Sequence, residues 1–121
     1  MGLSLIASGT YLPTALTTQD TLFTDTTVGL KQFIISQRNL PAGSPLNLSF
    51  QTLILSSSSY DEYDNDTLEV GVAIPAAPSL GYTPVKIYSW EGSLYGLQII
   101  AQILSGSLPT TGLTWALYGV S

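Results

Sequence analysis

Short segments in which apolar and polar side chains alternate, separated by proline-rich stretches, restrict the fold of this chain more than any other feature. Leu46, Leu48 and Phe50 alternate with polar neighbours, and this period of two predicts a half-buried strand. The apolar phase slips at Gln51 and Thr52, which indicates a bulge or a sharp bend. By the same criteria, further strands are predicted around residues 3–7, 21–23, 28–36, 68–74, 85–90 and 113–120.

The segment at residues 94–104 fits two patterns. Its isoleucines have helical spacing, whereas Leu97 and Ile99 belong to a series with strand spacing. Isoleucine is branched at Cβ and Gly96 is flexible, and both properties disfavour a helix. We therefore predict a strand here, paired antiparallel with the strand at residues 113–120.

Proline clusters at residues 40–45, 75–78 and 105–109 separate the predicted strands. Proline cannot donate the backbone hydrogen bond that a central strand requires, so each cluster marks a loop. Strands and loops recur every 8–12 residues or so, as in antiparallel sandwiches, and no long helical pattern alternates with them. We predict one all-β domain over residues 1–121, an antiparallel β-sandwich, jelly-roll-like, with about eight strands.

Charged side chains are scarce. They make up 9% of the chain, whereas soluble domains devote about a quarter of their residues to them. Charged residues are depleted at the centres of protein–protein interfaces, so we expect a homo-oligomer whose surface is covered by neighbouring subunits. The net charge is −5 with only three cations, and the absence of a basic patch argues against binding to nucleic acid or to an anionic membrane.

The segment at the N-terminus has no basic residues before its apolar ones, so it does not predict a signal peptide. No apolar run approaches the roughly 20 residues that cross a bilayer. We expect a protein made in a cytoplasm without export.

The chain contains no histidine and no cysteine, which removes the usual nucleophile–base pairs, thiolate chemistry and disulfides. Lys31 and Lys86 lie in alternating segments, where a lysine is expected to point to water rather than to activate a serine. A glycosidase needs two carboxylates beside a groove, and Glu91 with one acidic residue of segment 60–66 has no spacing that supports this role. We predict neither enzymatic activity nor a cofactor.

Half of the carboxylates lie in the segment at residues 60–66. Its simplest interpretation is a solvated acidic loop that leads into the strand at Leu68. Clustered carboxylates are also ligands for Ca²⁺, although the glycine and glutamate positions of an EF-hand loop are missing. The alternative is therefore a cation site formed by Asp61, Glu62, Asp64 and Asp66.

Aromatic side chains gather in the last third of the chain. Tryptophan and tyrosine are enriched in cores and at subunit interfaces, so we predict that they anchor one or the other. A platform for stacking sugars is the alternative. The candidates for interface anchors are Trp90, Tyr95, Trp115 and Tyr118.

The chain resembles the small jelly-roll proteins that decorate the capsids of tailed bacteriophages, called cement or decoration proteins. The resemblance covers the whole chain and consists of a Ser/Thr-rich sequence of this length without cysteine or histidine, with PAGSP at residues 41–45 and LTWALYG at residues 113–119. It implies a homotrimer on the capsid exterior, bound to the major capsid protein, that stabilises the shell of the virion. The family has no shared active site.

The expected function is therefore that of a non-enzymatic capsid decoration subunit. The resemblance extends to the head domains of phage tail fibres and tail tips. A β-sandwich head that binds a receptor or a carbohydrate is accordingly the alternative, and a subunit of a cellular surface layer is a third class.

Overall fold

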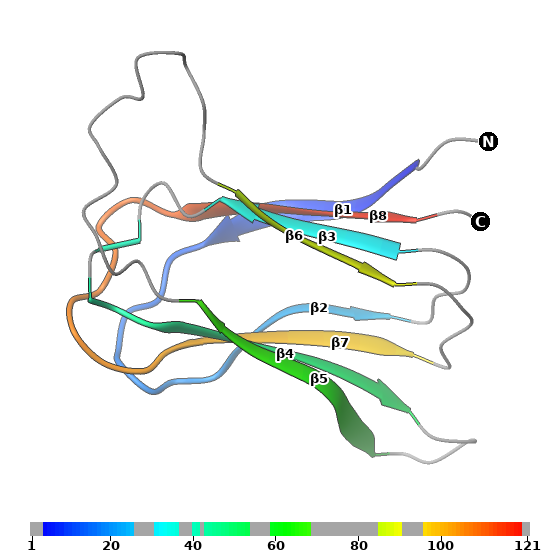
Figure 1. Ribbon diagram of the computed structural model, residues 1–121, viewed down its shortest axis with the longest axis horizontal. Coiled ribbons are helices and arrows are strands. Elements are labelled where there is room, and N and C mark those ends of the chain that lie inside the picture. The colour runs from blue at the N-terminus through cyan, green and yellow to red at the C-terminus, as the bar shows by residue number, and fades with distance from the viewer. Residues whose placement is uncertain are drawn as a thin grey trace.

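The computed structural model describes residues 4–25, 31–36, 40–41, 43–53, 59–68, 85–90 and 96–119. Within these residues the chain forms two antiparallel sheets that pack face to face (Figure 1). The strands are β1 (Ser4–Tyr11), β2 (Asp20–Asp25), β3 (Lys31–Ser36), β4 (Leu46–Leu53), β5 (Tyr60–Leu68), β6 (Val85–Trp90), β7 (Leu97–Ile103) and β8 (Leu113–Gly119). The predicted antiparallel β-sandwich of about eight strands is confirmed.

The strand order identifies the sandwich as a jelly roll. One sheet has the order β1-β8-β3-β6 and the other β2-β7-β4-β5. Of strands consecutive in the chain, only β4 and β5 lie side by side in one sheet within the described residues, while the other connections pass from sheet to sheet. This exchange between two four-stranded sheets is the jelly-roll arrangement. It leaves β1 and β6 as the edges of one sheet, and β2 and β5 as the edges of the other.

The core lies between the sheets and follows the predicted alternation. In β7 and β8 every second side chain is buried, and the side chains between them are half-buried or exposed. The rings of Phe33 on β3 and Phe50 on β4 meet edge to face across the sheets, with centroids 5.7 Å apart. Trp115 stacks on Phe33 at 5.9 Å. The aromatic rings thus join the two layers near the middle of the sandwich.

The predicted phase slip at Gln51 is confirmed as a bulge between β4 and β5. Phe50 pairs with Asp64 and Gln51 with Glu62, so the additional residue lies on β5, at Tyr63. The pairing of β4 with β7 runs through the same position without a shift. The sequence signal therefore appears on β4, whereas the inserted residue belongs to its neighbour.

The predicted pairing of one strand is wrong, and the buried face of another is decided by packing. Within the segment at 94–104, residues Leu97–Ile103 form the strand β7. However, β7 pairs with β2 and β4, while the expected partner β8 pairs with β1 and β3 in the opposite sheet. In β6 the side chain of Ile87 is 51% exposed, and Tyr88 and Trp90 pack against the core. Both faces of β6 carry apolar side chains, so alternation alone does not select the buried one.

Two proline-containing loops are joined at one end of the sandwich. Ser44, fully buried, accepts a hydrogen bond at its Oγ from the backbone N–H of Ser107 (2.9 Å). The N–H of Leu104 donates to the carbonyl of Pro45 (2.9 Å). The loops predicted at 40–45 and 105–109 are thus confirmed, except at Ala42, which lies outside the described residues. Of the strand predicted at 68–74 only Leu68, the last residue of β5, is described, and the loop predicted at 75–78 lies outside the described residues.

Within the described residues no helix is long and apolar enough to cross a membrane.

Candidate functional site

A cleft opens along one side of the sandwich, between the edge strands β5 and β6. Its volume is about 380 Å³, and its walls include side chains from both sheets. This size lies within the range of about 300–1,000 Å³ that is common for small-molecule sites. The cleft is the candidate functional site of the described part of the chain. Its lining residues are Phe50, Asp64, Asn65, Asp66, Lys86, Ile87, Tyr88, Ser89 and Trp90.

The acidic segment that was expected to form a solvated loop is in fact the edge strand β5. Aspartate and asparagine are unfavourable in strands, but pairing with β4 along the whole segment outweighs this preference. Asp66 lies opposite Leu48 and Asp64 opposite Phe50, and directly opposed residues share one face of a sheet. Because Leu48 and Phe50 are buried, both carboxylates project toward the space between the sheets.

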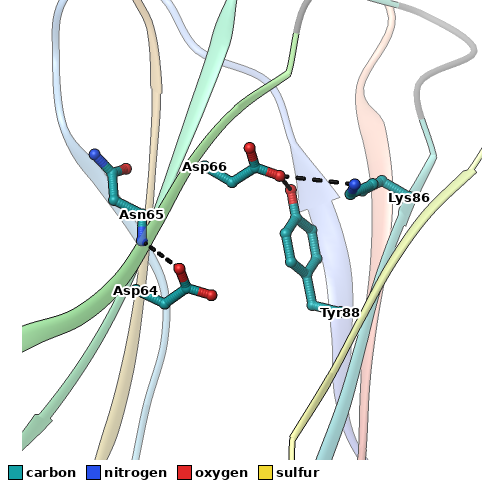
Figure 2. A network of polar contacts seen from close by, with 5 residues as sticks. All are labelled: Asp64, Asn65, Asp66, Lys86 and Tyr88. Atoms are coloured by element: carbon teal, nitrogen blue, oxygen red, sulfur yellow. Dashed lines mark hydrogen bonds and ion pairs between the residues drawn. The ribbon is translucent and has the colours of Figure 1, made fainter.

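Asp66 connects the two edge strands. The Tyr88 hydroxyl donates a hydrogen bond to Asp66 Oδ2 (3.1 Å), and Lys86 Nζ lies 3.8 Å from the same oxygen (Figure 2). Lys86 Nζ also lies 5.5 Å from the centroid of the Tyr88 ring, within range of a cation–π contact. Burial raises the pKa of Tyr88 well above its usual value, and the charges of Asp66 and Asp64 add to this. Tyr88 therefore remains a neutral hydrogen-bond donor across the physiological pH range.

Asp64 is the residue next to Asp66 on the same face of β5, and it lies outside this network. Its Oδ1 accepts a hydrogen bond from the backbone N–H of Asn65 (2.9 Å), while the Asn65 side chain points away from Asp66 and Tyr88 (Figure 2). Asp64 is exposed. An ionised carboxylate has about four acceptor positions, so Asp64 retains the capacity to accept further hydrogen bonds at the cleft.

The inner end of the cleft is aromatic. Phe50 is 1% exposed, and its ring lies 4.9 Å from Tyr88 and 5.5 Å from Trp90, centroid to centroid. Tyr88 and Trp90 are half-buried and lie on the same face of β6. The cleft therefore combines an aromatic wall with two carboxylates and one ammonium group at its mouth.

The carboxylates of β5 do not assemble into a cation site. Among the described residues no group of three or more potential ligands is close enough to hold a metal ion. Glu62 accepts a hydrogen bond from the Ser49 hydroxyl (2.6 Å), and Ser49 alternates with the inward-facing Leu48 and Phe50. Glu62 thus lies on the face opposite Asp64 and Asp66. Successive side chains of β4 point to opposite faces, and the bulge at Tyr63 shifts the alternation of β5 between Glu62 and Asp64.

The four residues predicted as interface anchors have different positions. Trp115 is 7% exposed and belongs to the core, which is one of the two roles predicted for these aromatic residues. Its indole lies over Gly9 of β1, where an added Cβ would meet the ring at 3.0 Å. Trp90 lines the cleft, and Tyr118 is half-buried on the face of β8 opposite Trp115. Tyr95 lies outside the described residues.

Lys31 was expected to point to water and is instead 1% exposed. It shares the inward face of β3 with Phe33 and Ile35, and it pairs with Gly119 of β8. A Cβ on Gly119 would lie 3.2 Å from Lys31 Cδ, so the lysine stem occupies the space that this glycine leaves. Burial lowers the pKa of Lys31. The other predicted surface lysine, Lys86, is 44% exposed but lies on the inward face of β6.

Comparison with known proteins found no matching family model, no matching curated protein and no matching solved structure.

Sequence reasoning did not place the acidic segment and the aromatic residues of β6 in one site. The signal was present in the spacing, because Asp64 and Asp66 are two residues apart, as are Lys86, Tyr88 and Trp90. Such spacing puts each set on one face of a strand. The spacing does not show that the inward face of β5 and the inward face of β6 are opposed at the same side of the sandwich.

Proposed function

We propose that this protein is a non-enzymatic structural subunit of a bacteriophage virion, a decoration protein that binds the outer surface of the capsid and stabilises the shell. Jelly rolls occur in viral capsid proteins and in lectins, and the scarcity of charge favours a surface that is covered by other subunits. The absence of histidine and cysteine supports a role without catalysis.

The observation that carries this proposal is the composition of the β1 edge. Unpaired strand edges invite pairing with other chains, and proteins protect them with charges. The described edges β2, β5 and β6 all carry charged residues, whereas β1, with the sequence SLIASGTY, has none. A bulge between Leu5 and Ala7 is its one irregularity. The first charged side chain of the whole sequence is Asp20.

Exposed apolar side chains accompany this uncharged edge. Among the described residues, most of the large apolar side chains that are exposed lie on β1 and in the segment after it: Leu5 57%, Ile6 40%, Leu12 52% and Leu16 39%. Hydrogen bonds of Thr17 with Ile103 (2.8 Å) and Gln102 (2.7 Å) hold that segment against the end of β7. We propose this edge as the contact with the major capsid protein and with the other copies in a trimer.

Electron microscopy of the native virion tests the proposal directly. We expect density for the sandwich on the capsid exterior, with β1 turned toward the neighbouring subunits. Absence of the protein from purified capsids, or its presence only in the tail, would contradict a decoration role.

Binding to shells depleted of this protein provides a second test. Leu5→Lys places a charge on the β1 edge and should abolish co-sedimentation with the shells, because a desolvated unpaired charge is costly at an interface. Ile87→Lys is the matched control, since Ile87 is similarly exposed (51%) but lies on β6 of the same sheet. Equal binding by both variants would remove β1 from the interface.

A further inference from the structure

We propose that the cleft between β5 and β6 binds an uncharged sugar. This inference goes beyond the decoration role and does not depend on it, because the cleft lies at the side of the sandwich formed by β5 and β6, whereas β1 is at the opposite edge of its sheet.

The first argument is the set of hydrogen-bonding groups at the mouth of the cleft. Asp64 and Asp66 supply acceptors, and each keeps acceptor positions beyond the bonds described above. Lys86 is 44% exposed and has three N–H donors. Its ion pair with Asp66 occupies one side of the ammonium group. A sugar hydroxyl donates one hydrogen bond and accepts others, so neighbouring hydroxyls match a site that offers both donors and acceptors.

The second argument is the wall of the cleft. The half-buried residues Tyr88 and Trp90 line the cleft, and their rings pack against the buried ring of Phe50. Aromatic rings provide a rigid apolar surface with little loss of conformational entropy. The C–H face of a pyranose ring is apolar, and its hydroxyls lie at the rim. A sugar therefore matches a cleft with an aromatic wall and a charged mouth.

Charge separates this ligand from the other classes. Two carboxylates and one ammonium group leave the mouth with a net negative charge, which disfavours an anion. A cationic ligand would gain from the carboxylates but would meet the ammonium of Lys86, which already lies between Asp66 and the Tyr88 ring. A neutral ligand with hydroxyl groups avoids both repulsions and can hydrogen-bond to the carboxylates and to the ammonium group. The observations thus favour an uncharged sugar over an arginine or lysine side chain of a partner protein.

The test uses the intact purified chain and a panel of neutral mono- and disaccharides, followed by NMR and by isothermal titration calorimetry. Arginine amide and acetate are the cationic and anionic comparison probes. We expect saturable binding of at least one sugar with a dissociation constant of roughly millimolar order, as is reasonable for a small ligand in one shallow cleft. Amide chemical shifts should change along β5 near Asp66 and along β6 near Tyr88.

Two variants on the same strand locate the site. Asp64→Asn removes a charged acceptor at the cleft and should weaken sugar binding about tenfold or more, in line with the usual contribution of a hydrogen bond to a charged group. Asp61→Asn is the matched control, because Asp61 is an exposed aspartate of β5 that does not line the cleft. It should change the affinity by less than about twofold.

Three results would overturn the proposal. The first is that no sugar binds at about 50 mM, where even a weak site of this kind would be occupied. The second is that arginine amide binds and the sugars do not, which would assign a cation site. The third is that Asp64→Asn and Asp61→Asn weaken binding equally, or that the shifts map away from β5 and β6.

Discussion

The hydrogen bond between Tyr88 and Asp66 is the contact of the cleft whose contribution can be worked out best from the structure. Tyr88→Phe removes only the hydroxyl and leaves the ring against Phe50 and Phe33. Hydrogen bonds to charged groups contribute about 1.5–3 kcal/mol. The Asp66 side chain is 39% exposed, so water competes for it and compensates part of the loss. We expect Tyr88→Phe to lower the free energy of unfolding by about 1 kcal/mol.

A double-mutant cycle isolates this interaction from other effects of each substitution. Tyr88→Phe and Asp66→Ala, alone and combined, should show a coupling energy of about 1 kcal/mol. Lys86→Met is the control. The Lys86–Asp66 pair is 3.8 Å apart and both side chains are about 40% exposed, and pairs of this kind contribute about 0–1 kcal/mol.

Urea denaturation followed by circular dichroism provides the measurement. All variants are compared at one protein concentration, because self-association raises apparent stability by mass action. A change of 1 kcal/mol corresponds to a shift in melting temperature of about 3–5 °C for a chain of this length. Strictly additive effects of the two substitutions would refute the reasoning, since the two edge strands would then not be coupled through Asp66.

Three further predictions concern burial, backbone conformation and metal binding. Lys31→Met should raise stability at pH 7, because burial disfavours the ammonium form of Lys31 in the native state. Burial lowers the pKa of Lys31 in the native state, so the unfolded chain binds more protons than the native protein as the pH approaches 10.5, and the stability of the wild-type chain rises with pH. The stability advantage of Lys31→Met, measured by urea denaturation, should therefore shrink from pH 7 to pH 10. A constant difference in stability between the two chains over this range would contradict the prediction. Gly106→Ala should lower stability by about 2 kcal/mol or more in the same assay, because Gly106 has φ +83° and an added Cβ would lie 2.8 Å from the carbonyl oxygen of Gly43. An unchanged urea midpoint would show that the loops at 40–45 and 105–109 separate readily. Millimolar calcium should leave the melting temperature unchanged, since Glu62 lies on the face of β5 opposite Asp64 and Asp66 and the described carboxylates form no group of three. A rise reversed by EDTA would show that the carboxylates do converge.

The two proposed surfaces lie on opposite sides of the sandwich, one at β1 and the other between β5 and β6, and they follow the same physical rule. Edge strands attract other chains unless charges protect them. On β5 and β6 the inward-facing Asp64, Asp66 and Lys86 oppose pairing with another strand, and they leave room for a small ligand. On β1 no charge opposes it. The distribution of eleven charged residues thus separates an edge suited to a ligand from an edge suited to a subunit.

The sequence alone determined the local structure. A period of two is possible only in an extended chain whose alternate residues face a core, and this predicted the strands that became β4, β7 and β8. Proline fixed the loops because it cannot donate to a ladder. The slip at Gln51 marked the bulge. Each of these inferences needs only neighbouring residues.

Only the tertiary structure decided which strands pair and which face is buried. Hydrogen bonds between strands use backbone groups that every residue has, so the sequence does not specify that β8 lies between β1 and β3 instead of beside β7. Alternation shows that Tyr88 and Trp90 share a face, but the choice between that face and Ile87 depends on the sheet packed against it. Asp64 and Asp66 suggest a loop by local preference, and pairing with β4 makes them part of a strand. The cleft exists because these long-range contacts bring the edge strands β5 and β6 together. The local sequence contains no information about the distance between these two strands.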